Sequence, residues 1–185
     1  SGAVGGLGGN DVITATGADI QSLLGTGGHI DGGAGIDTLK LAAGTNLNLA
    51  SLTSNQTVKP IQEIEVFAMQ GGSSVLSVTA NDVLSLGGGA GTMAPTYNFT
   101  STTQTTGATG STASTGKVQM IIHGVLGDTL NLNALANDGV SGTGTNAGVL
   151  GNTNLAGTWA YKGTVTLNDA QGIPHTYKVY DHSTT

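Results

Sequence analysis

The chain has 185 residues, of which 37% are hydrophobic and only 9% are charged; 32 are glycine and none is cysteine. Eleven acidic residues outnumber the five lysines, arginine is absent and the net charge is −6, so the chain lacks the basic face that nucleic-acid binding requires. The composition also excludes disulfides and thiolate metal sites. No apolar run approaches the length of a membrane span. From the charge and from this absence, respectively, we expect no nucleic-acid partner and no direct membrane insertion.

Glycine, threonine, asparagine and serine fill most of the remaining positions. This mixture is typical of many short strands joined by turns rather than of long helices. The first residues lack the pattern of a signal peptide, and we expect the chain to be a piece of a longer protein.

The segment from Gly6 to Ile13 is the first of two glycine-rich motifs. With Leu7 in place of one glycine, it follows the G-G-x-G-N-D-x-U form of the nonapeptide G-G-x-G-x-D-x-U-x, which binds Ca²⁺ in β-rolls. Its polar residues, Asn10 and Asp11, are candidate ligands, because Ca²⁺ prefers carboxylate and carbonyl oxygens.

The segment from Gly32 to Lys40 matches every position of the same nonapeptide. Its glycines allow positive φ, so that successive carbonyls can point at one ion, and Leu39 is expected to point into the core. The candidate ligands in and beside this segment are Asp31, Gly33, Gly35 and Asp37. A glycine-rich hairpin turn with an aspartate that caps its own backbone is the alternative interpretation.

The two motifs are further apart than the repeat of a regular β-roll allows, as the positions of Gly9 and Gly35 show. Two nonapeptides make a repeat of about 18 residues, so the interval carries an insertion of about eight. Within it, Ile20, Leu23 and Leu24 have helical spacing before a glycine, which predicts one or two helical turns.

Alternating apolar residues then predict short half-buried strands around positions 39–41, 47–49, 64–66 and 75–78. Thr79 and Asp82 have the spacing of a capping box and predict the start of a further helical turn. Glu63 and Glu65 alternate with apolar residues, and we interpret them as a solvated strand face, with a metal-ligand role as the alternative.

Residues 87–117 are almost entirely glycine, alanine, threonine and serine around Tyr97. This tract either contains further strands or is a surface loop that carries a ligand site. Strand character returns at residues 117–123. It is followed by Asp128, which precedes Thr-Leu as Asp37 does and is a further Ca²⁺ candidate. The segments 159–165 and 176–180 are predicted to be hairpin strands.

Motifs of the main enzyme classes are absent from the sequence, including nucleophile elbows, zinc-protease helices and phosphate loops. The four histidines lack ligand spacing and are interpreted as turn or surface residues, so we do not expect an enzyme. Aromatic residues are both core residues and binding anchors. The candidate ligand-binding residues are Tyr97, Trp159, Tyr161 and Tyr180.

The order of segments resembles the C-terminal region of large repeats-in-toxin (RTX) adhesins, which are exported by type I secretion. The resemblance rests on the glycine motif that runs from Ile30 to Leu39 and on the segments 61–67, 76–86, 127–132, 157–159 and 177–180. It implies a secreted or cell-surface protein of a Gram-negative bacterium that folds outside the cell when Ca²⁺ is available. Adhesins of this kind act in attachment and biofilms, and some carry Ca²⁺-dependent modules for peptides or sugars.

We therefore predict an all-β fold: a Ca²⁺-stabilised β-sandwich-like domain with a short β-roll at its N-terminal end. An irregular parallel β-solenoid is the alternative. Residues 1–41 are expected to form a Ca²⁺-binding entry segment that is continuous with a β-rich module at 42–185. The expected function is Ca²⁺-dependent adhesion to a peptide or glycan on a host or neighbouring cell. The alternative function is a structural spacer, surface-layer or folding module whose only ligand is Ca²⁺.

Overall fold

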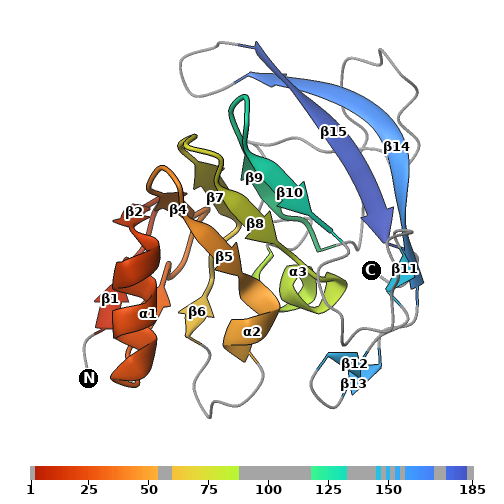
Figure 1. Ribbon diagram of the computed structural model, residues 1–185. Helices are drawn as coiled ribbons and strands as arrows, with labels where there is room; N and C mark the ends of the chain where they lie inside the picture. The colour runs from red at the N-terminus through yellow and green to blue at the C-terminus, as the bar shows by residue number, and fades with distance from the viewer. Residues whose placement is uncertain are drawn as a thin grey trace.

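The computed structural model describes residues 3–53, 60–87, 118–132, 145–146, 149–150, 153–154, 157–168 and 174–182. Its main body is a winding in which each circuit of the chain, called a pass below, lays its strands beside those of the previous pass (Figure 1). Every strand pair of this body is parallel.

The second and third passes contain the same order of short elements, and the described parts of the first and fourth passes contain part of that order. The first pass contains β1 (Ala3–Gly5), β2 (Val12–Ala15) and helix α1 (Gly17–Gly25). The second contains β3 (His29–Asp31), β4 (Thr38–Leu41), β5 (Asn46–Asn48) and α2 (Leu49–Thr53). The third contains β6 (Ile61–Gln62), β7 (Val66–Met69), β8 (Val75–Ser77) and α3 (Ala80–Leu86). The fourth contains β9 (Ile121–His123) and β10 (Thr129–Asn131).

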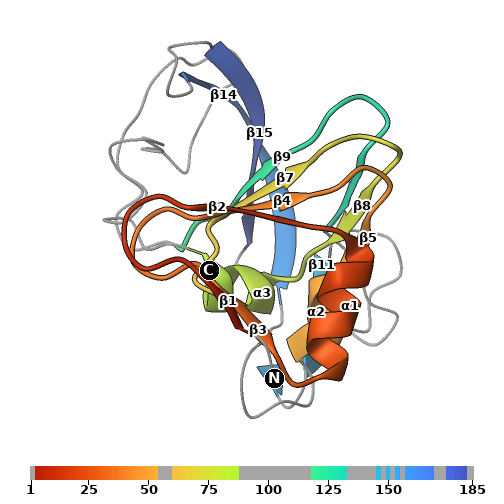
Figure 2. The same cartoon turned by 90° about the vertical axis from the view of Figure 1, so that its left-hand side faces the viewer.

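The strands assemble into a first sheet (β1-β3-β6), a central sheet (β2-β4-β7-β9) and a third sheet (β5-β8-β10). Figure 2 shows the central sheet with its strands in this order. Val12 pairs with Thr38, so the spacing of the two glycine motifs is the repeat between the first two passes. Thr38 in turn pairs with Val66, and Val66 with Ile121.

The core lies inside the winding, because alternate residues of each strand point inward. Leu39 and Leu41 of β4 stack on Phe67 and Met69 of β7, and all four are almost completely buried. The first and third sheets close the same core with Ile30, Leu47, Ile61 and Leu76.

A helix closes each of the first three passes, and α1 confirms the helical turns predicted around Ile20. The predicted capping box of α3 is also confirmed: the Thr79 hydroxyl accepts from the backbone N–H of Asp82, whose carboxylate accepts from the Thr79 backbone. Thr16 and Asp19 form the same reciprocal pair at the start of α1. The described helices are all too short to cross a membrane.

The predicted β-sandwich is wrong. The body consists of three all-parallel sheets with helices between passes, which is a mixed α/β architecture, whereas a sandwich is built from antiparallel strands. The alternative solenoid shares the parallel pairing, but helices α1, α2 and α3 contradict an all-β chain. Period-two alternation marks a half-buried strand without giving its direction, which is why the sequence pattern did not separate these architectures.

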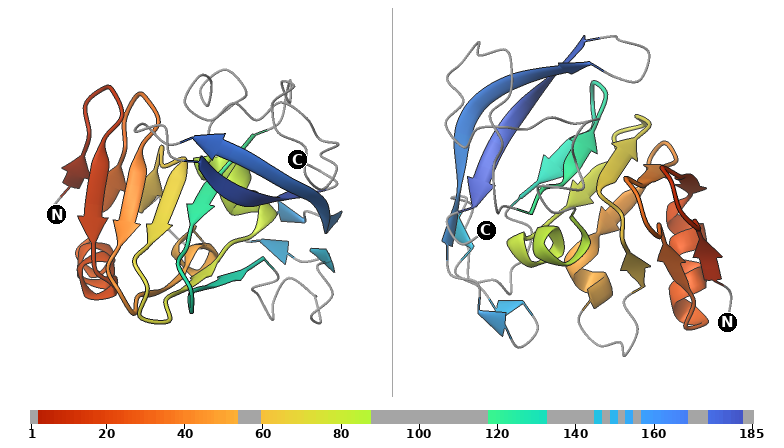
Figure 3. Two further views of the ribbon diagram at one scale, coloured as in Figure 1. Left: turned by 90° about the horizontal axis from the view of Figure 1, so that it is seen from above. Right: turned by 180° about the vertical axis from the view of Figure 1, so that it is seen from behind.

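The C-terminal part of the described chain is antiparallel and lies beside β9 (Figure 3). A long hairpin is formed by β14 (Gly157–Asn168) and β15 (Pro174–His182), which confirms the hairpin predicted there. Three two-residue strands accompany it: β11 (Thr145–Asn146), β12 (Val149–Leu150) and β13 (Thr153–Asn154). The tract at 88–117, with Tyr97, lies outside the described residues.

Candidate metal centre

Three acidic residues occupy the same position in successive passes, directly before the strands of the central sheet. They are Asp11, Asp37 and Glu65, whose following residues are partners in the sheet. The backbone N–H of Asp11 donates to Oδ1 of Asp37 (2.8 Å), and the backbone N–H of Asp37 donates to Oε2 of Glu65 (2.9 Å). The carboxylates of Asp37 and Glu65 therefore each connect their own pass to the preceding one by a hydrogen bond. We call Asp11, Asp37 and Glu65 the acidic ladder.

Close packing of the glycine turns places oxygen atoms beside this ladder. A Cβ atom on Gly32 would collide with the carbonyl oxygen of Glu63 and lie 2.8 Å from Oδ2 of Asp37. One pass earlier, a Cβ atom on Gly6 would collide with the carbonyl oxygen of Gly32 and with Oδ2 of Asp11. Each glycine thus brings together a carboxylate oxygen and a carbonyl oxygen of the next pass, which no residue with a side chain would permit.

Asp37 is fully buried, and within the described part of the chain its Oδ2 atom has no hydrogen-bond partner. Burial raises the pKa of its carboxyl group, and the neighbouring charges of Asp11, Glu63 and Asp31 raise that pKa further. Burial also raises the pKa of Glu65. A buried polar atom without a partner requires an explanation.

These residues fit Ca²⁺, which binds carboxylate and carbonyl oxygens together. The atoms that would hold it are Oδ2 of Asp37 and the carbonyl oxygen of Glu63, with Oδ2 of Asp11 and the carbonyl oxygen of Gly32 as the equivalent pair one pass earlier. Among the described residues, no three side chains of histidine, aspartate or glutamate converge into a metal cluster. A cation here would therefore depend on backbone oxygens, as the glycine motif implies.

The other predicted ligands of the two motifs lie around the same turns but already have partners. Oδ1 of Asn10 accepts from the backbone N–H of Ile36 (3.0 Å), and Oδ1 of Asp31 accepts from the backbone N–H of Gly33 (3.1 Å). At Gly35 a Cβ atom would collide with the carbonyl oxygen of Gly9. These contacts shape the turns and fasten the first pass to the second.

Asp128 belongs to a different turn. Its Oδ2 atom accepts from the backbone N–H groups of Gly71 and Val125 (both 3.1 Å), and its Oδ1 atom accepts from that of Ser74 (3.0 Å). Three backbone donors thus occupy both carboxylate oxygens, which gives Asp128 the role of a turn cap that joins the third and fourth passes.

Replacing Asp128 by asparagine should lower the free energy of unfolding by about 2 kcal/mol, because the amide nitrogen cannot accept from two of these N–H groups. The measurement is chemical denaturation with Ca²⁺ and with a chelator. Equal losses are expected in both conditions, since the cap acts without metal; a loss seen only with Ca²⁺ would identify Asp128 as a ligand.

The interpretation of Glu63 and Glu65 as one solvated strand face is wrong for Glu65, which is buried and accepts from Asp37. Both residues precede β7 rather than lie within it. Glu63 is exposed and has φ +49°, in the left-handed region that favours glycine. The position of Glu63 is the signal that could have identified it as a turn residue. Glu63 directly follows β6, as Gly32 directly follows β3.

Three of the four aromatic candidates lie on the hairpin, and Tyr97 lies outside the described residues. Trp159 and Tyr161 belong to β14, and Tyr161 pairs with Tyr180 of β15, which is 37% exposed. His123 is not the surface residue that was predicted, because it is half-buried and its Nδ1 atom lies 3.0 Å from the Tyr177 hydroxyl.

Comparison of the chain with models of protein families, with curated proteins and with solved structures finds no match.

Proposed function

We propose that this chain is a Ca²⁺-stabilised structural module of a secreted or cell-surface protein, in which Ca²⁺ holds successive glycine turns together. The observation that carries the proposal is the buried Oδ2 atom of Asp37, which lacks a hydrogen-bond partner among the described residues and lies beside the carbonyl oxygen of Glu63. The resemblance to RTX adhesins supports an extracellular location and export by type I secretion.

Bound Ca²⁺ would supply positive charge and coordination to oxygens that the fold has already removed from water. The chain's own residues position those oxygens. Gly6 and Gly32 permit the close approach of successive passes, and backbone N–H groups of the preceding pass fix the carboxylates of Asp37 and Glu65. In the absence of a cation, the repulsion between Asp37 and its neighbouring carboxylates opposes this packing.

A structural role is favoured over direct adhesion because Asp37 is fully buried. A Ca²⁺ ion that presents a peptide or sugar must keep a coordination position open to solvent. Attachment to a partner surface, which the resemblance also implies, would then belong to other parts of the module or of the longer protein.

Thermal unfolding in Ca²⁺ and in a chelator tests this proposal. Ca²⁺ at about a hundred times its Kd should stabilise the folded state by about 2.7 kcal/mol, which is a rise of roughly 5–10 °C in Tm for a chain of this size. Mg²⁺ should give a much smaller rise, since it requires a tighter octahedral shell. A Tm that chelation leaves unchanged would refute the proposal.

A further inference from the structure

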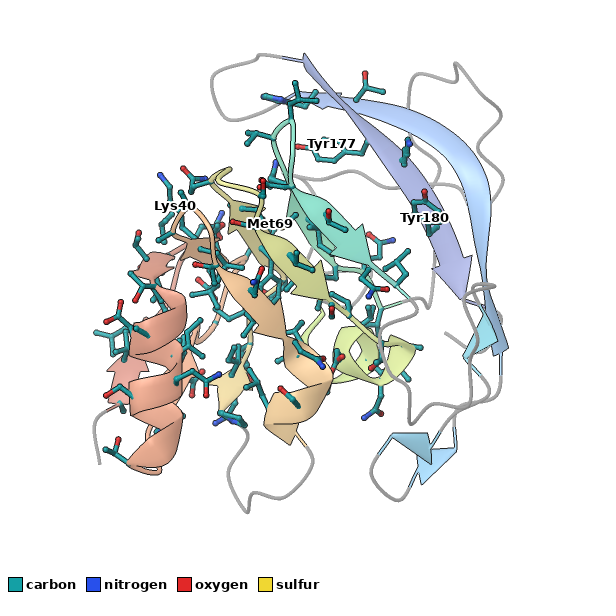
Figure 4. The ribbon with its side chains drawn as sticks, in the orientation of Figure 1. Lys40, Met69, Tyr177 and Tyr180 are labelled. Carbon is teal, nitrogen blue, oxygen red and sulfur yellow. The ribbon has the colours of Figure 1, made fainter. Side chains whose placement is uncertain are left out.

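The β14–β15 hairpin meets the parallel body through Tyr177 of β15. The Tyr177 ring packs against Ile36, Val66 and Ile121, which form a small apolar cluster separate from the main core. Figure 4 shows Tyr177 between β15 and the body, whereas Tyr180 lies further along the same strand. Val66 and Ile121 are partners in the central sheet, and they alternate with the inward-facing Phe67 and Ile122, so this cluster covers the outer face of that sheet.

A polar contact lies beside this apolar one. The Tyr177 hydroxyl is 3.0 Å from Nδ1 of His123, and the two rings meet edge-to-face with centroids 5.3 Å apart. The His175 ring, also on β15, is perpendicular to the His123 ring at 6.5 Å. In the neutral tautomer whose Nδ1 atom is unprotonated, the Tyr177 hydroxyl donates a hydrogen bond to His123, and protonation of the imidazole removes this acceptor.

We propose that His123, Tyr177 and His175 form a pH-sensitive latch, which holds the hairpin on the outer face of the central sheet at neutral pH and releases it in mild acid. The three side chains come from β9 and β15 and not from the glycine turns. The latch is therefore built from other residues than the proposed Ca²⁺ site, although Tyr177 also packs against Ile36 of the second glycine motif.

The direction of the effect follows from the surroundings of His123. Burial lowers the pKa of its imidazole below the ordinary value of 6.5, and the nearby His175 lowers that pKa further. The hairpin-released form, in which His123 meets water, therefore takes up a proton more readily than the latched form. The latch contributes its full stability above pH 6.5 and loses it progressively as the pH falls through the depressed pKa.

Within the described part of the chain, the net effect of the surroundings of His123 is to disfavour its protonated form. β7 presents the uncharged Val66 and Ala68 to β9. Lys40 of β4 lies in the same row as His123, one strand beyond Ala68, and its positive charge opposes protonation. A carboxylate at Asp128, which lies near Gly124, would favour protonation of His123, but burial and His175 outweigh it, because the pKa of His123 is lowered overall. From β15, the titratable groups in ring contact with His123 among the described side chains are His175 and Tyr177.

Hydrogen exchange of the β15 amides tests the latch in Ca²⁺-containing buffer at about pH 7.5 and about pH 5. The released form takes up a proton more readily than the latched form, so acid shifts the balance toward release. After correction for intrinsic exchange, protection of the amides of residues 175–182 should therefore fall several-fold in acid, while protection of β4 and β7 stays constant. Equal protection of the hairpin at both pH values would overturn the proposal.

Three variants separate the latch from general acid effects. His123→Gln keeps a hydrogen-bond acceptor that does not titrate, and it should abolish the fall in protection. His29→Gln, on β3, is the matched control and should retain the full fall. His175→Gln should reduce the fall without abolishing it, because burial is the larger cause. The substitution His123→Gln could instead expose the hairpin at both pH values. In that case the wild type is compared with His175→Gln, and an equal fall in hairpin protection in these two proteins would overturn the proposal.

Discussion

Replacing Gly32 by alanine is expected to destabilise the protein by about 3 kcal/mol, the upper end of the range for overpacking. The added methyl group would collide with the carbonyl oxygen of Glu63 and crowd the Asp37 side chain. Both obstacles are rigid, since one is backbone and the other is hydrogen-bonded to Asp11. Chemical denaturation measures the loss, and Ca²⁺ should rescue little of it, because the second and third passes must separate to make room.

Gly25→Ala is the matched control. Gly25 is the last residue of α1, and a Cβ atom there meets nothing within 4 Å. This substitution should be neutral or should stabilise the protein by about 0.5 kcal/mol, because alanine reduces the freedom of the unfolded chain. Comparable losses at both positions would contradict the stacked-turn geometry.

Asp37→Asn is expected to change stability in opposite directions with and without Ca²⁺. In a chelator, the variant should be more stable than wild type near neutral pH, because it removes a buried charge that Asp11, Glu63 and Asp31 repel. Its Oδ1 atom can still accept from Asp11, and its new amide N–H groups lie beside the carbonyl oxygen of Glu63. In saturating Ca²⁺, the variant should lose the rise of about 2.7 kcal/mol expected for wild type.

The pH dependence of the free energy of unfolding provides a check on these opposite effects of Asp37→Asn. Because folding raises the pKa values of Asp37 and Glu65 above 3.8 and 4.5, the chelated wild-type protein binds extra protons when folded. The contribution of these two groups to stability therefore rises as the pH falls through the raised pKa values, and the stabilisation by Ca²⁺ shrinks over the same window because protons compete for the oxygens. Asp37→Asn should flatten both trends, and an unaltered Ca²⁺ response in this variant would exclude Asp37 as a ligand.

Local chemistry was readable from the sequence. The capping box of Thr79 and Asp82 and the helix around Ile20 depend on residues three or four positions apart, and both were predicted. The G-G-x-G-x-D spacing likewise led to Asp37 and its turn. The burial of Glu65 was not readable, because its donor, the backbone N–H of Asp37, belongs to the preceding pass and is far away in the sequence.

Strand direction was the other feature beyond sequence reasoning. Leu39, Leu41, Phe67 and Met69 would give the same alternation in an antiparallel sandwich and in a parallel winding. Only the recurrence of the glycine motif suggested that equivalent residues stack, and two copies do not fix the course of the whole chain.

The spacing between passes has a consequence for how freely the chain can be altered. Val66 pairs with Thr38 on one side and with Ile121 on the other, and the connection to Ile121 is almost twice as long as the connection from Thr38. Doubling the sequence separation of two paired residues costs only about 0.6 kcal/mol in chain entropy. Strand register and the three hydrogen bonds that Asp128 accepts from backbone N–H groups are therefore large enough to hold the fourth pass in place despite the longer separation, and substitutions that remove them should release this pass before the others.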